Sequence, residues 1–321
     1  MTGVVPAEGV ILERVLEAAH GVSPEGLTRG AYARFDAAQM KTEWGRRHRR
    51  RFALVDGPSV LAGATQYDLA AVLDQESVRV CGIGDVFSAP PDRDAGHARE
   101  LVDRLLDEAA RAGAAMALLF QGMSREHRPA GCEPVSMADS ELRITESSRR
   151  GAPMTPIRGG EERDLAAIAA MGKIRADPFP FHLDRDVAFV QHAIIRKRLL
   201  AGLGQAGACQ LHFFIAEEGI TAAAYVVINI VGDTWTIEEC GDRDPSGARV
   251  GAILQALIAR EPVERRPTIR AWLPRGFVPP QVTIVSAQPS ADVLMVRPLG
   301  SRPLRPRLSG DDVLYWHGDI F

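Results

Sequence analysis

An arginine and a glycine stand where a β-leaning run of the sequence gives way to a long amphipathic run. Arg93 lies three residues before Gly96, and Pro90 and Pro91 precede both. A helix that begins here offers unpaired backbone N–H groups and the positive end of its dipole, and a glycine lets the chain approach a ligand closely. An arginine adds a charge that can bind two phosphate oxygens at once. The pattern predicts an anion site that fits a diphosphate; a plain strand-to-helix turn with a solvated arginine is the alternative.

The elements on either side of this loop must position it. Ser77–Ser88 has the composition of a strand, and so do Arg51–Asp56 and the run after the following turn. Beyond the loop, apolar residues recur at helical spacing on one face. They are Ala98, Leu101, Val102, Leu105, Leu106, Ala109 and Ala110. Gly113 predicts the end of this helix, and Ala114–Phe120 reads as a buried strand.

The second half of the chain repeats this plan. Phe213–Glu218 and Thr234–Gly241 read as strands, and a helical run and a further strand follow them. The offset of roughly 155–160 residues suits a duplicated domain. Since the polar segment Ser147–Gly160 reads as a linker, we expect an N-terminal domain over 1–148 and a C-terminal domain over 149–300. A tail over 301–321 is expected to pack back on the core.

Composition bounds the function. The chain has 321 residues and a formal net charge of -3, which argues against a general nucleic-acid binder. The N-terminus has neither the basic region nor the apolar run of a secretory signal, and no later run approaches a membrane span. The cysteines are scattered without metal-ligand spacing. We therefore expect a cytoplasmic protein without metal, membrane or nucleic-acid partners.

The densest basic run is Arg46–Arg51, directly before a strand. Such a run could bind RNA or an acidic substrate. No aromatic residues are interleaved with it, and bases would need them for stacking. We interpret the run as a solvated helix end.

The residues Arg93–Ala98 resemble the R-x-x-G-x-G/A signature of the GNAT superfamily of N-acetyltransferases. Pro90 matches a proline that this family often has, and the preceding GIGDVFSAP resembles the family's fourth strand. The helix and strand that follow resemble its third helix and fifth strand. AGCEPV resembles a hairpin start, with Cys132 in a position that the family fills with Phe. The resemblance is close over about residues 25–145, and the second half resembles the fold with a weaker motif.

This resemblance implies an α/β (α+β, mixed-sheet) fold. Two tandem GNAT-like domains are expected, each a mostly antiparallel mixed sheet flanked by helices. The tandem arrangement is similar to that of Eis-type acetyltransferases, although this chain shows no sterol-carrier-like third domain.

The resemblance also implies that the cofactor is acetyl-CoA. A strand backbone would pair with the pantetheine arm and polarise the thioester carbonyl; its residues are Val86, Phe87 and Ser88. The pyrophosphate would be wrapped by the amides of Arg93, Asp94, Ala95, Gly96, His97 and Ala98. Gln121, just past the fifth strand, is a further cofactor contact or else a strand-end surface residue.

Acetyl transfer to an amine needs a base and benefits from an acid near the leaving thiolate. Many family members place a Tyr four residues before the glycine that corresponds to Gly131, and here that position holds His127. His127 is the candidate acid, Asp85 is a candidate base, and Phe321 is another through its terminal carboxylate, which reaches the active site in Eis-type enzymes. The alternatives are a surface histidine, a capping aspartate and a tail that only packs.

The equivalent loop in the second half departs from the signature. Arg243 and Gly247 are four residues apart instead of three, and Asp242 and Asp244 would repel a diphosphate. We interpret this second site as degenerate.

The sequence therefore predicts an acetyl-CoA-dependent N-acetyltransferase. It would transfer acetyl to a primary amine of a small molecule or peptide by direct attack in a ternary complex. The alternative is an inactive acyl-CoA-binding or sensing module whose second domain binds a partner or ligand. A homo-oligomer is compatible with either.

Overall fold

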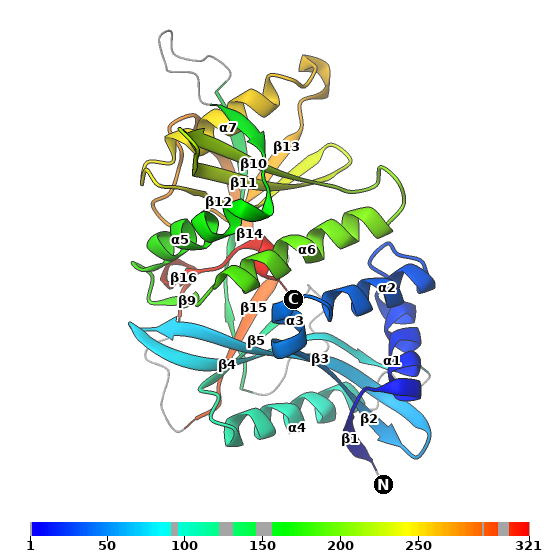
Figure 1. Ribbon diagram of the computed structural model, residues 1–321. Coiled ribbons are helices and arrows are strands. Elements are labelled where there is room, and N and C mark those ends of the chain that lie inside the picture. Colours follow the sequence, from blue (N-terminus) through cyan, green and yellow to red (C-terminus); the bar gives the residue numbers. More distant parts are fainter. Residues whose placement is uncertain are drawn as a thin grey trace. The chain divides into compact units, whose positions relative to one another are not determined.

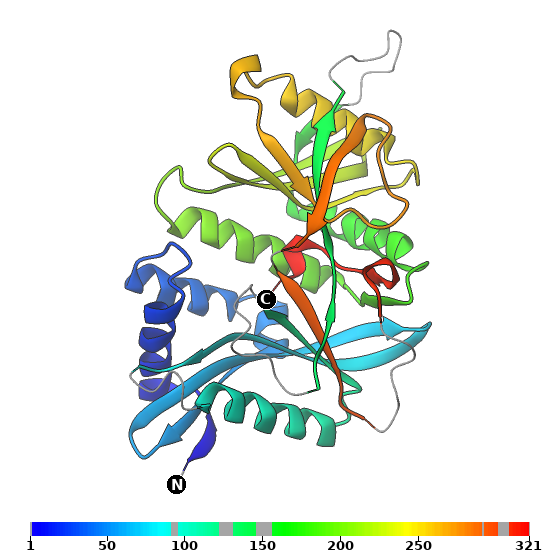
Figure 2. The same ribbon diagram turned by 180° about the vertical axis from the view of Figure 1, so that it is seen from behind.

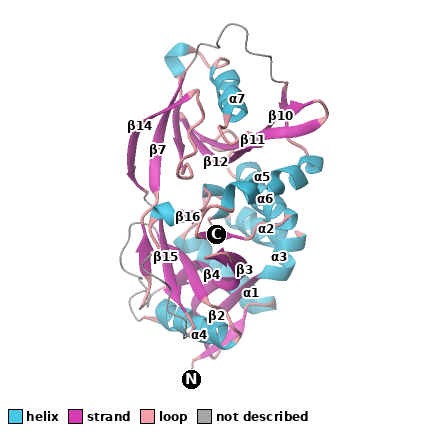
Figure 3. Cartoon of the chain, turned by 90° about the vertical axis from the view of Figure 1, so that its left-hand side faces the viewer, coloured by secondary structure: helices cyan, strands magenta, loops and turns pink. Residues whose placement is uncertain are grey.

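The computed structural model describes residues 2–90, 96–121, 131–145, 156–290, 292–300 and 308–320. The chain divides into two compact units, each discontinuous in sequence. The first comprises Met1–Ser136 and Ala291–Ser309, and the second comprises Met137–Ser290 and Gly310–Ile320. Each unit is a mixed sheet flanked by helices (Figures 1 and 3).

The sheet of the first unit has the strand order β1-β2-β3-β4-β5-β15-β6. Neighbouring strands are antiparallel except β4 and β5, which are parallel. The bounds are β1 Gly3–Pro6, β2 Arg49–Asp56, β3 Ser59–Leu73, β4 Glu76–Ser88, β5 Met116–Gln121, β6 Glu133–Val135 and β15 Val293–Pro298. The helices are α1 Gly9–Val22, α2 Arg29–Gln39, α3 Glu43–His48 and α4 His97–Arg111.

Helix α4 covers one face of this sheet, and α2 and α3 lie on the other (Figure 1). The apolar stripe of α4 explains why this helix lies over the sheet. Leu101, Leu105 and Leu106 are fully buried and pack with Leu54 and Ile83 of the strands. Burying each such side chain contributes about 1.5–3 kcal/mol, so this stripe fixes α4 over the strands that lead into its own loop.

The second unit repeats the strand order as β8-β10-β11-β12-β13-β7-β14. Within this order β12 and β13 are the parallel pair among the described residues, and they correspond to β4 and β5. Outside this order, β16 pairs with β9 in parallel. The strand bounds are β7 Ala138–Ile144, β8 Ile157–Gly159, β9 Phe181–Leu183, β10 Gln210–Glu218, β11 Thr221–Val231, β12 Thr234–Asp242, β13 Thr268–Ala271, β14 Val282–Pro289 and β16 Val313–Leu314. The helices are α5 Leu165–Ala176, α6 Val187–Leu203 and α7 Ala248–Ile258, with short 3₁₀ turns at Glu162–Asp164, Val263–Arg265, Gly310–Asp312 and His317–Asp319.

One strand of each sheet comes from the other half of the chain. β7 follows β6 along the chain, yet it pairs with β13 and β14 of the second unit (Figure 2). β15 follows β14, yet it pairs with β5 and β6 of the first unit. Both strands fill the same place in their sheet order, so the halves of the chain have exchanged equivalent strands.

The end of the described chain packs into the second unit. Val313, Leu314, Tyr315 and Trp316 are all buried, and Leu314 and Trp316 belong to the core that α7 covers. The Tyr315 hydroxyl donates to the Asp319 carbonyl at 2.9 Å, and Arg196 donates to the Ile320 carbonyl. Gly310–Ile320 is therefore an ordered part of this unit.

Candidate functional site

Strand β4 changes register at Asp85. Gly63 of β3 pairs with Phe87 and Thr65 pairs with Gly84, so β4 carries an extra residue over this stretch. Asp85 has a φ of 50°, a left-handed conformation that non-glycine residues rarely adopt. Such bulges re-aim a strand and its side chains and are frequent beside active sites.

The bulge lies where β4 and β5 separate. Their pairing covers only Val80–Ile83 and Met116–Leu119. Beyond it, Gly84–Ser88 stays paired with β3, and no other described strand pairs with its opposite edge. Backbone groups on that edge need partners. They can hydrogen-bond an extended ligand that enters between the two strands.

The N-terminus of α4 adjoins the end of this edge. Gly96 caps the helix with a φ of 77°, and a Cβ added there would meet no atom of the described residues within 4 Å. The backbone N–H of Ala98 donates to the Ser88 hydroxyl at 3.2 Å. Strand and helix thus bring together the candidate cofactor residues on both sides of the loop, and no described side chain covers Gly96 at the helix end, where an anion can bind.

Asp85 is held in a buried network of charges. Its Oδ2 accepts hydrogen bonds from Thr65 Oγ1 at 2.8 Å and from Arg51 Nη2 at 3.1 Å. Arg51 Nε also donates to Asp36 Oδ1 at 2.8 Å, and Arg49 Nη2 donates to the same oxygen at 2.6 Å. The Asp85 side chain is 30% exposed, whereas that of Arg49 is 1% exposed. Two arginines and two aspartates therefore form a cluster without net charge, and the Asp85 carboxylate is its part-exposed member.

The network corrects our interpretation of the basic run Arg46–Arg51. Helix α3 ends at His48, and β2 begins at Arg49, so the last arginines alternate across a strand. Arg49 and Arg51 point into the unit and are buried, because Asp36 on α2 and Asp85 on β4 supply their counter-charges. Only Arg46 and Arg47, exposed in the last turn of α3, form the solvated helix end that we expected.

Electrostatics keep this cluster ionised. Burial by itself would raise the pKa of Asp36, but the charges of Arg49 and Arg51 outweigh it and hold that pKa below its ordinary value. Burial, followed by the charge of Asp85, raises the pKa of Tyr32. A neutral phenol thus accompanies the ion cluster.

Several expected site residues lie outside the described part of the chain. These are Arg93, Asp94, Ala95, His127 and Phe321. The backbone of Gln121 ends β5, where it pairs with Val293. The assignments of these residues stay predictions.

The second unit has the corresponding strand-to-helix junction. β12 bulges at Glu238, since Val227 pairs with Glu239 and Ile228 pairs with Ile237. Gly247 caps α7 with a φ of 72°. The local geometry of the two junctions is therefore alike.

This second junction is closed by its own side chains. Asp242 accepts the backbone N–H of Arg249 in the first turn of α7 at 2.8 Å and that of Asp244 at 2.9 Å. A Cβ added at Gly247 would lie 2.6 Å from the ring of Phe277. An anion at this helix end would meet the Asp242 carboxylate and would find Gly247 covered by Phe277. At Gly96, no described side chain takes such a place.

A second buried ion cluster lies beside the β12 bulge. Arg185 Nη1 donates to Glu239 Oε1 at 2.8 Å, and Tyr225 donates to the same oxygen. Arg185 Nε lies 3.1 Å from Asp319 Oδ1 at the chain's end, and Lys197 Nζ lies 2.9 Å from Glu238 Oε2. Burial raises the pKa of Asp319 to about 7. Asp319 thus ties the tail to the part of β12 in the second unit that corresponds to the Asp85 bulge of β4.

The sequence reasoning missed the partners in both clusters. In the first unit they are Asp36, Arg49, Arg51 and Thr65, and in the second they are Arg185, Glu238, Glu239 and Asp319. Two adjacent glutamates inside the apolar strand TWTIEECG were a usable signal, because buried charges need partners.

No family model and no curated protein matches the sequence. Solved structures do resemble it. A GNAT-family N-acetyltransferase from Anabaena variabilis matches with a TM-score of 0.67 and 14% identity over 93% of this chain and 73% of its own. Eis1 from Mycobacterium abscessus matches with a TM-score of 0.58 and 15% identity over 93% and 74%. N-myristoyltransferase from Saccharomyces cerevisiae, with bound myristoyl-CoA, matches with a TM-score of 0.55 and 10% identity. This match covers 92% of this chain and 82% of the myristoyltransferase chain.

These likenesses define the fold. The chain has the GNAT fold, and the expected α/β class with mixed sheets flanked by helices is confirmed. In the described part of the chain, no helix is long and apolar enough to cross a membrane. No group of three or more His, Cys, Asp or Glu among those residues is arranged to hold a metal ion.

Proposed function

We propose that the first unit binds acetyl-CoA and transfers its acetyl group to a primary amine. The junction at the end of β4 carries this proposal. A bulge, an unpaired strand edge and an open helix N-terminus meet there. Each is a feature that a thioester with a pantetheine arm and a diphosphate can use. The acyl-CoA ligand and the acyltransferase names of the structural neighbours support it further.

In this proposal the chain's own groups bind and orient the co-substrate. The backbone of Val86, Phe87 and Ser88 pairs with the pantetheine arm and polarises the thioester carbonyl. The amides of the loop and of Gly96, His97 and Ala98 hold the pyrophosphate, with Arg93 as an added charge. Gln121 contacts the cofactor from β5.

The proton transfers are assigned to three groups. Asp85 accepts the ammonium proton directly or through water, since its side chain is part-exposed at the bulge. Its fixed bonds to Thr65 and Arg51 hold it in one orientation. His127 donates to the leaving thiolate. The Phe321 carboxylate is the alternative base.

The second unit serves as scaffold, substrate wall or dimer surface in the proposed protein. Its helix end is closed by Asp242 and Phe277, which supports a degenerate cofactor site. The described cysteines are free, which suits a reducing cytoplasm. The acceptor is a small-molecule or peptide amine.

A second candidate is an acyl-CoA sensor without turnover. The ion pairs of Arg49 and Arg51 with Asp85 favour it, because they already engage the carboxylate oxygen that would take the proton.

One experiment separates the candidates. Calorimetric titration first measures CoA binding, and release of free thiol from acetyl-CoA is then measured over a panel of polyamines, amino acids, aminoglycosides and lysine peptides. Binding with amine-dependent thiol release supports the transferase. Binding without release on any amine supports the sensor, and no binding overturns both.

A further inference from the structure

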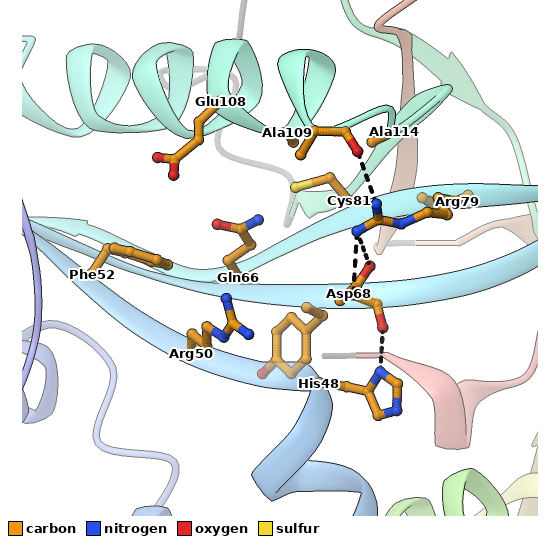
Figure 4. Close-up of a pocket in the computed structure, with 13 residues that line it drawn as sticks. His48, Arg50, Phe52, Gln66, Asp68, Arg79, Cys81, Glu108, Ala109 and Ala114 are labelled. Carbon is orange, nitrogen blue, oxygen red and sulfur yellow. Dashed lines mark hydrogen bonds and ion pairs between the residues drawn. The ribbon is translucent and has the colours of Figure 1, made fainter.

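A hollow of about 130 Å³ lies in the first unit, between the C-terminal half of α4 and strands β2, β3 and β4 (Figure 4). It is lined by Val80 and Cys81 near the start of β4, whereas the bulge at Asp85 lies near that strand's end. The hollow is therefore separate from the proposed transfer site.

Strand register gathers polar side chains beneath the helix. Arg50 pairs with Gln66 across β2 and β3, and Asp68 pairs with Cys81 across β3 and β4. Alternate residues share a face of a sheet, so Arg50 and Gln66 lie on the same face as Leu54, Ala62, Ala64 and Ile83. Those four pack in the apolar core under α4. Arg50 itself is exposed and Gln66 is half-buried, so these polar side chains stand at the edge of that core, where the hollow opens to solvent.

Alanines create the space. The earlier turns of α4 bury Leu101, Leu105 and Leu106 against the strands. At the hollow, the helix and its exit present Ala109, Ala112 and Ala114. Replacing leucine-sized side chains by methyl groups leaves room for a few non-hydrogen atoms.

The charges around the hollow fall into two groups. Arg79 is satisfied, because it lies 3.3 Å from Asp68 Oδ1 and donates to the Ala112 carbonyl at 2.8 Å. The side chains of Arg50, Gln66 and Glu108 make no hydrogen bond or ion pair with any part of the chain that the structure describes. In Figure 4, Glu108 extends from α4 toward the strands, and Gln66 extends from β3 toward the helix.

The Cys81 thiol adds no charge to the wall of the hollow. Burial, with the nearby charge of Asp68, raises the pKa of the Cys81 thiol to about 12, so this thiol stays neutral. The hollow therefore offers an unpaired cation on a strand, an unpaired anion on the helix and an amide that both donates and accepts.

We propose that this hollow binds a small α-amino acid in its zwitterionic form. Its carboxylate would bind the Arg50 guanidinium, which matches carboxylate geometry. Its ammonium would bind the Glu108 carboxylate, and the Gln66 amide would bond to either group. A short side chain would rest on the alanines. A ligand with one charge leaves Arg50 or Glu108 unpaired and binds more weakly.

Calorimetric titration with glycine and L-alanine tests the proposal. We expect binding of both amino acids, with acetate and methylammonium at least about tenfold weaker. Arg50→Gln and Glu108→Gln should each weaken glycine binding about tenfold or more. Arg104→Gln is the matched control, because Arg104 lies on α4 but pairs with Glu100 and does not line the hollow. It should bind glycine as the unaltered protein does.

A double variant sharpens the test. Arg50→Glu with Glu108→Arg reverses both charges, and it should recover glycine binding that either single reversal removes. The proposal is overturned if the unaltered protein does not bind glycine, or if Arg50→Gln or Glu108→Gln binds glycine as tightly as the unaltered protein does. CoA titrations of the same variants keep the two proposals apart, because their CoA affinity should be unchanged whichever way the glycine result falls.

Discussion

At the scale of single residues, Asp85 and Gly96 define the proposed transfer site. Asp85 takes a left-handed conformation at the bulge, and its charge is held by Arg51 and Thr65. Gly96 takes a left-handed conformation at the start of α4, and an added Cβ there would meet no atom of the described part of the chain within 4 Å. In the proposed reaction, Asp85 would accept the proton of the acceptor amine, and Gly96 would lie beside the diphosphate.

Gly96→Asn and Gly96→Asp form a matched pair for the diphosphate. Asparagine tolerates a positive φ and resembles aspartate in shape, so the difference between the variants isolates the negative charge. Repulsion near the helix end should cost roughly 1–4 kcal/mol. CoA titration should show Gly96→Asp much weaker than Gly96→Asn. Equal CoA affinity in the two variants would show that the diphosphate does not bind beside Gly96.

Asp36→Ala should destabilise the first unit. It leaves the buried guanidiniums of Arg49 and Arg51 short of a counter-charge, a loss that typically costs about 3–5 kcal/mol. Urea denaturation measures the change. Glu43→Ala is the control, since its partner Arg47 is exposed, and it should change stability by less than about 1 kcal/mol. A similar small effect for Asp36→Ala would contradict the buried network.

At the scale of elements, the chain builds the strand–bulge–helix junction twice, and among the described residues side chains close only the second one. Both helices begin at a left-handed glycine, Gly96 for α4 and Gly247 for α7. Around Gly247, Asp242 and Phe277 take the places that a diphosphate would need. Similar backbone geometry at the two helix starts therefore carries different chemistry.

We therefore expect each chain to bind one CoA molecule. The carboxylate of Asp242 already accepts an N–H from the first turn of α7 and would repel a diphosphate. Calorimetric titration should give a stoichiometry near one. A value near two would show that the second junction opens after all.

The 3₁₀ turn His317–Asp319 should make stability depend on pH. Burial raises the pKa of Asp319 from its ordinary 3.8 to about 7. The negative charge of Glu239 also raises this pKa, and the positive charge of Arg185 lowers it. Between these values the folded chain holds a proton that the unfolded chain has lost. The free energy of unfolding should therefore fall as pH rises from about 4 to about 7.

Denaturation of the protein and of Asp319→Asn across that range measures the effect. The variant should lack this part of the decline, because asparagine does not titrate. Asp311→Asn, at an exposed position of the same tail, should keep the full decline. Parallel curves for all three proteins would exclude Asp319 as the source.

At the scale of the whole molecule, the two units share one chain through exchanged strands. β7 completes the second sheet and β15 completes the first, although each lies in the other half of the sequence. The tail residues Gly310–Ile320 belong to the second unit. Neither unit therefore corresponds to one continuous segment of the chain.

A C-terminal tag tests the proposal that the Phe321 carboxylate is the base. A few added residues displace that carboxylate but keep the buried anchors Tyr315 and Trp316. Turnover should fall while CoA affinity stays nearly constant. An N-terminal tag of equal length controls for bulk. Equal turnover with either tag would return the role of base to Asp85 or to a chain of waters.

The sequence by itself determined the local elements. Its periodicity predicted the strand over Ser77–Ser88 and the helix from His97, and both are confirmed as β4 and α4. The loop signature predicted the GNAT fold, which the structure has. These features follow from residues near one another in sequence, because hydrophobic period and turn chemistry are local.

Only the tertiary structure decided which charges and strands meet. Arg49 and Arg51 are buried because Asp36 and Asp85 arrive from other elements, and a basic run gives no sign of partners that lie far along the chain. The exchange of β7 and β15 is equally invisible, since either strand has the pattern that fits either sheet. Local pattern fixes the type of an element, but the free energy of burying charges and completing sheet edges depends on the whole fold.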